Sequence, residues 1–257
     1  MKLSIITINR NNAAGLETTI QSVICQGFVD YEYIVIDGNS TDGSVDIIKK
    51  YSEHIHYWVS EPDSGIYNAM NKGIKKANGE YVIFMNAGDC FLSGDTLMNI
   101  FSKERTTDIV IGNLIKKWKT KDEKRIVSGK ITFYNFISGF LILPHQASFI
   151  KRSLFDEIGF YDENLKITSD WKFFLFALFK YNKSIEVIDE FVASMDTTGI
   201  SNSKEGIVCM AKEQNETLKA HFPYFYDDYQ ELYLLKRFTF ARLKKHIKWR
   251  LSPFLYK

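Results

Sequence analysis

Cysteine is scarce in this chain of 257 residues, and the three cysteines present, Cys25, Cys90 and Cys209, form no CxxC pair. Their spacing excludes a cysteine-rich zinc site and a disulfide framework as the basis of the fold. We expect reduced thiols, as in a cytosolic protein. No apolar run approaches the roughly 20 residues that span a bilayer. The apolar and hydroxyl run after Met1 and Lys2 is too short for the core of a secretory signal, so we expect a cytoplasmic location.

Acidic residues are missing from the C-terminal tail, residues 236–257, which holds eight Lys or Arg. Residues 1–235 hold 25 basic and 31 acidic residues, so the net charge of +2 conceals a charge asymmetry. Apolar residues recur in the tail at helical spacing: Phe240, Leu243, Ile247 and Leu251. Such a basic amphipathic helix either lies on an anionic membrane surface, peripheral at the inner face, or packs on the domain with its basic face in water. Nucleic acid is not an expected partner, because the rest of the chain is acidic and carries no nucleic-acid-binding module.

Apolar runs typical of buried strands alternate with helical patterns through the first half of the chain. We expect strands at 3–8, 33–36, 56–60, 81–85 and 108–111, and helices at 14–26, after the caps at 40–42, and at 64–77. The overall content of 45% hydrophobic and 25% charged residues is that of a soluble globular protein. The alternation predicts an α/β fold, with a mostly parallel, twisted sheet flanked by helices.

The second half of the chain is less regular. Residues 116–124 are strongly charged and predict a solvated hairpin or loop, and residues 196–205 form a polar loop. We expect strands at 147–150 and 185–193, an aromatic-rich helix at 171–181, and two final helices at 207–221 and 228–249. The simplest organisation is one α/β domain over residues 1–204 with a basic, amphipathic helical extension over residues 205–257.

Polar segments follow four successive strands of the expected sheet, at residues 7–11, 37–43, 61–65 and 86–89. Turns and helix caps need the same residue types, so each segment alone has a structural explanation. In an open α/β sheet, however, the carboxyl ends of the strands meet along one edge, where ligands bind. Four such segments in a row therefore predict a ligand site at that edge.

These segments resemble the family 2 glycosyltransferases, whose fold is a Rossmann-like sheet called GT-A. The matching text is Ser4-Ile-Ile-Thr-Ile-Asn9, then residues 33–44, 61–74 and 79–89, and later Pro144-His-Gln146, residues 158–162 and Ser169-Asp-Trp171. The resemblance covers about residues 1–200. It implies an inverting glycosyltransferase that moves a sugar from a nucleotide-diphosphate donor, with UDP expected, to a hydroxyl of a glycan or lipid-linked saccharide.

The resemblance also implies a donor site and a metal ligand. The donor-binding residues would be Thr7, Asn9, Asp37, Asn39, Asp63 and Asn86. Asp37 would accept a hydrogen bond from the base, since uracil and guanine both offer ring N–H donors. Asp89 would bind Mg²⁺ or Mn²⁺. The family's Asp-x-Asp-Asp pattern here reads Asn86-Ala-Gly-Asp89, so one carboxylate of three remains, and substrate phosphates would have to complete the coordination.

The expected catalytic base is Asp170, which occupies the family's position for an acidic residue at a helix start. An inverting transfer needs such a base to take the proton of the attacking hydroxyl. An acidic residue in the first turn also stabilises a helix without any catalytic role. Asp162 and Glu163 are nearby rivals for the base, although Asp162 lies in a turn.

Several further positions have both a functional and a structural explanation. On the acceptor side the candidates are His145, Gln146 and Trp171, where His145 is either a ligand contact or a hydrogen-bonded structural residue, and Trp171 either stacks on a sugar or fills the core. Gly199 and Ser201 lie in a loop that either closes over the diphosphate or is ordinary surface. Three other functions remain open: a sugar nucleotidyltransferase, although its Gly-rich phosphate loop is poorly matched, a non-catalytic nucleotide-sugar binding module, and a membrane-associated scaffold that the basic tail would attach.

Overall fold

The computed structural model describes residues 1–118, 120–197 and 199–235, with the Ile200 side chain left out. The strands are β1 (Leu3–Asn9), β2 (Tyr31–Asp37), β3 (Tyr57–Ser60), β4 (Tyr81–Phe84), β5 (Cys90–Phe91), β6 (Ile109–Lys117), β7 (Asp122–Arg125), β8 (Ser148–Lys151) and β9 (Ile185–Asp196). The helices are α1 (Ala13–Ile24), α2 (Ser44–Lys50), α3 (Ile66–Lys76), α4 (Thr96–Phe101), α5 (Phe133–Ile137), α6 (Ser153–Ile158), α7 (Ser169–Phe179) and α8 (Lys204–His221). Short 3₁₀ turns lie at Ser52–His54, His145–Ala147 and Ile200–Asn202.

The strands form one sheet in the order β3-β2-β1-β4-β8-β6-β9-β5, with β7 paired to β6. β3, β2, β1 and β4 run parallel, as the alternation of strands and helices predicts. β8 inserts antiparallel between β4 and β6, and β9 runs parallel to β6. The predicted α/β fold is confirmed, and the charged segment 116–124 is a β6–β7 hairpin.

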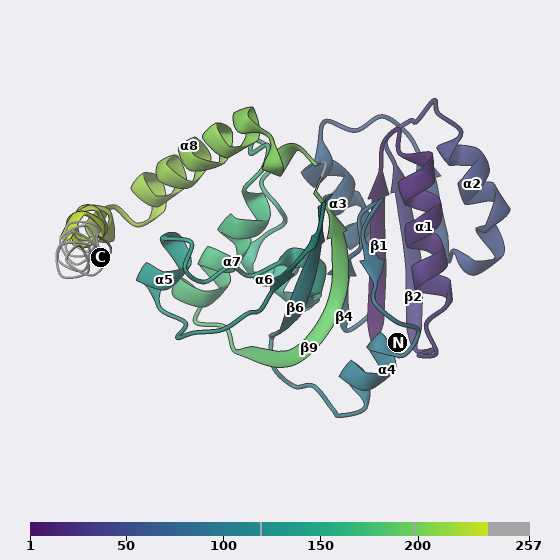
Figure 1. The fold of residues 1–257 in the computed structure, drawn as a ribbon, viewed down its shortest axis with the longest axis horizontal. Helices are drawn as coiled ribbons and strands as arrows, with labels where there is room; N and C mark the ends of the chain where they lie inside the picture. Colours follow the sequence, from purple (N-terminus) through teal and green to yellow (C-terminus); the bar gives the residue numbers. More distant parts are fainter. Residues whose placement is uncertain (119, 198, 236–257) are drawn as a thin grey trace, which may run out of the picture.

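Two apolar layers cover the two faces of the sheet. In β1, Ile6 and Ile8 pack on the side of α3 and α7, whereas Leu3 and Ile5 pack on the side of α1. Every residue of β1 is buried. A strand that is covered on both faces favours residues that can be buried at consecutive positions, which explains the run of apolar and hydroxyl residues in the sequence. Figure 1 shows α1 and α2 at one end of the molecule, beside β1 and β2.

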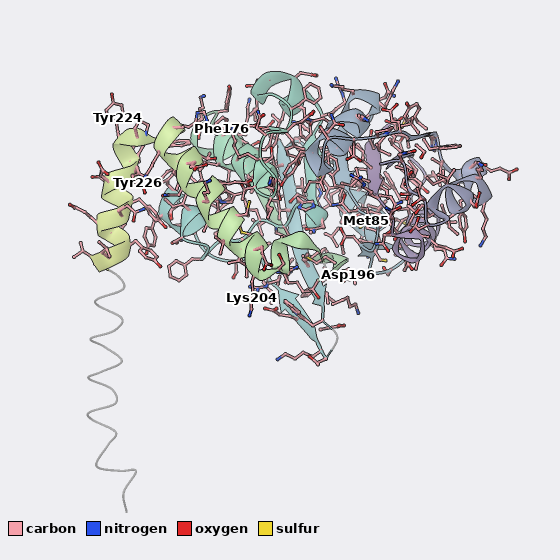
Figure 2. The ribbon with its side chains drawn as sticks, turned by 90° about the horizontal axis from the view of Figure 1, so that it is seen from above. Met85, Phe176, Asp196, Lys204, Tyr224 and Tyr226 are labelled. Carbon is pink, nitrogen blue, oxygen red and sulfur yellow. The ribbon has the colours of Figure 1, made fainter. Side chains whose placement is uncertain are left out.

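Helix α8 runs along the outer side of α7 (Figure 1) and belongs to the same core. Leu218 and Phe222, the residue directly after α8, are buried in the layer that contains α7. His221 packs on the ring of Phe176. A further helical segment follows at 223–235, where Tyr224 points outward and is 90% exposed (Figure 2). The boundary at residue 204 stays a prediction, because α8 shares the apolar layer of the domain before it.

The amphipathic pattern of the tail, from Phe240 to Leu251, lies outside the described residues. Among the helices that the structure does describe, none combines the length and apolar character that crossing a membrane would require.

Candidate functional site

The ends of β1, β2 and β3 are joined by the buried carboxylate of Asp37. It accepts hydrogen bonds from Asn9 Nδ2 at 2.8 Å, from the Ser40 backbone N–H at 2.9 Å and from the hydroxyls of Ser40 and Ser60, both at 2.6 Å. Burial alone would raise the pKa of Asp37, but these hydrogen bonds outweigh it and hold the pKa below its usual value. Asp37 therefore organises the loop as an anion, and its predicted bond to a base stays a prediction.

Asp63 lies against Gly38 in the same group of loops. A Cβ atom on Gly38 would approach Asp63 Oδ2 to 2.2 Å, so only glycine leaves room for this carboxylate. Arg10 Nη1 lies 3.8 Å from Asp63 Oδ1. Asn39 is exposed in the left-handed region, with φ of 59°. The predicted donor residues Asn9, Asp37, Asn39 and Asp63 thus gather at one sheet edge.

Thr7 lies deeper in the fold than the other predicted donor residues of this group of loops. It is fully buried on the α1 side of β1, where its hydroxyl donates to the Met85 carbonyl at 2.7 Å and lies 2.9 Å from the Tyr33 hydroxyl. Side chains alternate between the two faces of a strand, and this alternation directs Thr7 into the core on the α1 side. The hydroxyl thus has structural partners in the core, and the donor-binding role of Thr7 stays a prediction, as does that of the equally buried Asp37.

A cleft of about 740 Å³ is lined by other residues, and Asn9, Asp37, Asn39 and Asp63 are not among them. Eight of the predicted site residues line it: Asn86, Asp89, His145, Gln146, Asp170, Trp171, Gly199 and Ser201. They come from the β4 end, the 3₁₀ turn before β8, the start of α7 and the loop after β9, which are far apart in the sequence. The fold therefore brings the predicted metal, catalytic, acceptor and lid positions to one cleft.

Asp170 is held at the start of α7 by two side chains. Tyr67 donates its hydroxyl to Oδ1 at 2.8 Å, and His145 Nδ1 lies 3.0 Å from Oδ2. Burial alone would raise the pKa of Asp170, but the hydrogen bonds and charge of His145 and the Tyr67 hydroxyl hold it below its usual value. The rival Asp162 is bound by Lys172 Nζ at 2.6 Å, Glu163 accepts from two asparagines of α3, and neither lines the cleft.

His145 connects the base to the end of β4. Its Nε2 atom lies 3.5 Å from Asn86 Nδ2, while its Nδ1 atom faces Asp170. Burial lowers the pKa of His145, but Asp170 and Asp89 together raise it above its usual value. The structure thus gives this residue a hydrogen-bonded position inside the cleft, and its contact with an acceptor stays a prediction.

Asn86 and Asp89 form the candidate metal corner. Asn86 Oδ1 is buried and has no hydrogen-bond partner in the described part of the chain, and burial raises the pKa of Asp89 to about 7, against the charge of His145. Thr19 Oγ1 donates to the Asp89 carbonyl at 2.7 Å and fixes this turn. An orphaned amide oxygen beside a carboxylate fits a hard cation, although the described residues contain no cluster of three His, Cys, Asp or Glu ligands.

Two acceptor-side residues have mixed surroundings. Trp171 stacks on Phe136, with ring centroids 5.6 Å apart and an angle of 13°, so one face of the indole is covered by the core. Trp171 nevertheless lines the cleft. Gln146 is buried, and its Nε2 atom lies 3.7 Å from Met195 Sδ. Both side chains therefore help to shape the wall of the cleft.

The comparisons with known proteins agree on one family. A family model described as Glycosyl transferase family 2 matches residues 4–162. A protein of Mycobacterium tuberculosis described as uncharacterized glycosyltransferase Rv1514c is 34% identical over 211 residues, which covers 79% of this chain and 78% of that protein. The chain belongs to glycosyl transferase family 2.

Other relatives and solved structures extend this result. A PGL/p-HBAD biosynthesis glycosyltransferase of Mycobacterium bovis is 29% identical over 177 residues, covering 66% of this chain and 67% of that protein. Staphylococcus aureus TarS in complex with UDP has a TM-score of 0.65 at 19% identity, covering 88% of this chain and 72% of that one. A Pyrobaculum calidifontis mannosyltransferase with GDP-Man and Mn²⁺ has a TM-score of 0.59 at 18% identity, covering 87% and 63%. The structural likeness establishes the GT-A fold.

The sequence of this glycosyltransferase gave no sign of four further cleft or support residues. Tyr67 binds Asp170 across 103 residues of sequence. Asp196, labelled in Figure 2, lines the cleft at the end of β9, and its backbone N–H bonds to Asp89. Lys116 and Arg125 line the cleft from the hairpin. The only signal for the last two in the sequence is the alternation of side chains along a strand, which predicts that Lys116 and Arg125 share one face of a hairpin.

Proposed function

We propose that this family 2 glycosyltransferase moves a sugar from a nucleoside-diphosphate donor, with UDP expected, to a hydroxyl of a glycan or lipid-linked saccharide. The anomeric carbon would be inverted. One observation carries the proposal: Asp170 and Asp89 line the same cleft, and His145 contacts Asp170 on one side and Asn86 on the other. Such a transfer requires a base for the acceptor hydroxyl and a metal corner for the leaving diphosphate, and here both lie in one cleft.

Asp170 acts as the general base in this proposal. Its lowered pKa keeps the carboxylate ionised at neutral pH. It accepts the proton of the acceptor hydroxyl while the new bond to the anomeric carbon forms and the bond to the diphosphate breaks, so that the diphosphate departs with the bonding electrons. A carboxylate offers about four acceptor positions. The bonds from Tyr67 and His145 therefore orient Asp170 and still leave capacity for the acceptor hydroxyl.

The donor corner comprises Asp89, the orphaned Asn86 oxygen and the loops of Asp37, Asn39 and Asp63. A Mg²⁺ or Mn²⁺ ion held by Asp89 and Asn86 would neutralise the leaving diphosphate as a Lewis acid. Gly199 and Ser201 border the same cleft and are proposed to close over the diphosphate, which would exclude water from the activated sugar.

The names of the related proteins support this assignment. The TarS structure contains UDP and the mannosyltransferase contains GDP-Man and Mn²⁺, which supports a nucleoside-diphosphate donor and a divalent cation here. The PGL/p-HBAD name, together with a putative teichuronic acid biosynthesis glycosyltransferase of Bacillus subtilis that is 38% identical over 90 residues, supports a role in making cell-envelope glycans or glycolipids. A peripheral position at the inner face of the membrane would suit such acceptors.

The proposal is tested by separating donor binding from turnover. UDP binding would be measured by calorimetry with and without Mn²⁺, and sugar transfer or donor hydrolysis would be followed with a panel of nucleotide sugars. We expect Asp89→Asn to lose the tightening of UDP binding by Mn²⁺. Asp170→Asn would keep UDP binding and lose about 10²–10⁴-fold in turnover.

Glu163→Gln is the matched control, because Glu163 is a nearby acidic residue that does not line the cleft. Near wild-type turnover of Asp170→Asn at saturating donor would refute the assignment of the base. Donor binding without transfer or hydrolysis in the wild type would instead identify a non-catalytic binding module, and release of pyrophosphate from a nucleoside triphosphate would identify a nucleotidyltransferase.

A further inference from the structure

Two cationic side chains line the cleft from the β6–β7 hairpin. In this hairpin Leu114 pairs with Arg125 and Lys116 pairs with Glu123. Because side chains alternate between the two faces of a strand, these four residues share one face. Leu114, Lys116 and Arg125 all line the cleft, so this face is one of its walls. The strands of the hairpin project past the labelled Asp196 in Figure 2.

The two positive charges on this wall face one carboxylate, that of Glu123, which balances them only in part. Glu123 uses one carboxylate oxygen on Arg125 Nη2 at 3.0 Å and the other on the Trp118 indole N–H at 3.0 Å. Lys116 forms no ion pair within the described residues, and Arg125 Nε is buried there without a hydrogen-bond partner. Burial and the nearby Arg125 charge lower the pKa of Lys116 and outweigh the opposing effect of the Glu123 charge. The wall therefore fits an anionic ligand group.

The same part of the cleft is rich in apolar surface that reaches the outside. Ile126 follows Arg125 directly and is 59% exposed, and Phe140 and Ile142 are 70% and 51% exposed. All three line the cleft together with Lys116 and Arg125. Exposed apolar side chains beside a charged pair fit an amphipathic ligand better than a nucleotide, whose diphosphate carries no apolar chain.

We propose that Lys116 and Arg125 form a phosphate subsite for a lipid-phosphate-linked acceptor. The apolar chain of this acceptor lies along Ile126, Phe140 and Ile142, and its saccharide extends through the cleft toward Asp170. The proposal rests on the proposed transferase function and names the acceptor class for the same cleft. The positive charges of Lys116 and Arg125 would bind the negatively charged phosphate. Both side chains and Asp170 line the same cleft, so one ligand can reach the hairpin and the proposed base.

Calorimetric binding of four probes tests the subsite: farnesyl phosphate below its micelle threshold, farnesol, inorganic phosphate, and UDP with Mn²⁺. We expect the wild type to bind farnesyl phosphate at least about tenfold more tightly than farnesol or phosphate, because hydrogen bonds to charged groups exceed neutral ones. Lys116→Gln and Arg125→Gln should each weaken farnesyl phosphate about tenfold and leave UDP binding unchanged.

Lys124→Gln is the matched control on the same strand. Its Nζ atom lies 5.4 Å from the centroid of the Phe191 ring, and the residue does not line the cleft, so farnesyl phosphate should bind this variant as it binds the wild type. Equal affinity of the wild type for farnesyl phosphate and farnesol would overturn the proposal. So would a loss of UDP binding in Lys116→Gln, since the pair would then serve the donor diphosphate. Absence of UDP binding in the wild type would count against the proposed function, and the farnesyl phosphate comparison would still decide the subsite.

Discussion

Helix α8 contacts the segment before α7 through one buried carboxylate, that of Glu213. This side chain accepts hydrogen bonds from the backbone N–H groups of Lys166, Ile167 and Thr168, at 2.7, 3.2 and 3.1 Å, and from the Thr168 hydroxyl at 2.9 Å. Thr168 is the residue before α7, and it makes no capping bond of its own. Glu213 therefore fixes the turn from which Asp170 projects into the cleft.

Replacing Glu213 with glutamine would keep the shape and lose the charge. Glutamine places an NH₂ group where an oxygen now accepts, so at least one N–H donor of the turn would be left buried without a partner. Hydrogen bonds to a charged group contribute about 1.5–3 kcal/mol each, and we expect unfolding free energy to fall by about 2–4 kcal/mol. For a chain of this size the loss corresponds to a decrease of about 5–15 °C in melting temperature.

The pH dependence distinguishes this explanation from a general packing defect. Burial alone would raise the pKa of Glu213, but the hydrogen bonds from Lys166, Thr168 and Ile167 hold it below its ordinary value of 4.5. A lowered pKa means that the stabilisation is complete above the pKa of the unfolded chain and is lost as pH falls through the pKa of the folded protein. The stability difference between wild type and Glu213→Gln should therefore be full near neutral pH and shrink below about pH 4.5.

Urea unfolding at a series of pH values measures this difference directly. The matched control is Glu216→Gln on the same helix, because Glu216 is 63% exposed and its Lys212 partner is 3.9 Å away. We expect that control to unfold as the wild type does. A Glu213→Gln variant whose destabilisation is the same at neutral and acid pH would refute the role of the charge, and an unchanged melting temperature would refute the role of the hydrogen bonds.

Two further substitutions test the cleft. Tyr67→Phe removes the hydrogen-bond donor to Asp170 Oδ1, so the pKa of Asp170 should rise. The acid limb of the pH–rate profile should then move to higher pH, and turnover should be about tenfold lower. An unmoved acid limb would contradict this. Gly38→Ala places a Cβ atom 2.2 Å from Asp63 Oδ2, so the carboxylate must move. We expect weaker UDP binding by calorimetry with little change in melting temperature, and unchanged UDP affinity would show that Asp63 does not serve the donor.

Much of the fold could be predicted because its central strands are buried on both faces. β1 appears in the sequence as a run of apolar and hydroxyl residues and β4 as an apolar run, and more polar residues begin where each strand leaves the core. The strand-end pattern pointed to the segment of Asn86 and Asp89, the family resemblance pointed to Asp170, and all three line one cleft. Helix α7 begins at Ser169, two residues before the expected start and directly after Thr168, which Glu213 binds from another helix.

The remaining site residues could not be predicted, because their roles depend on contacts between distant segments. Tyr67 belongs to the apolar face of α3, and only the packing of α7 brings Asp170 to its hydroxyl. Thr7 has the residue type of a ligand contact, but the alternation along β1 directs it into the core. The charged hairpin was expected to be solvated, whereas one of its faces forms a cleft wall with Lys116 and Arg125. The local sequence pattern predicts which face of a helix or strand is apolar or charged, but not which other element packs against that face.

The candidate metal corner has one carboxylate, that of Asp89, where the family pattern has three, and this changes how a cation would bind. Asp89 is buried with its pKa raised to about 7, and Asn86 Oδ1 has no partner in the described residues, so this corner is short of positive charge. Two protein oxygens hold a hard cation weakly, and phosphate oxygens would complete the coordination. We infer that cation and diphosphate bind together, since each supplies what the other lacks. The asparagine at position 86 would then weaken cation binding before the donor arrives, while the site itself is retained.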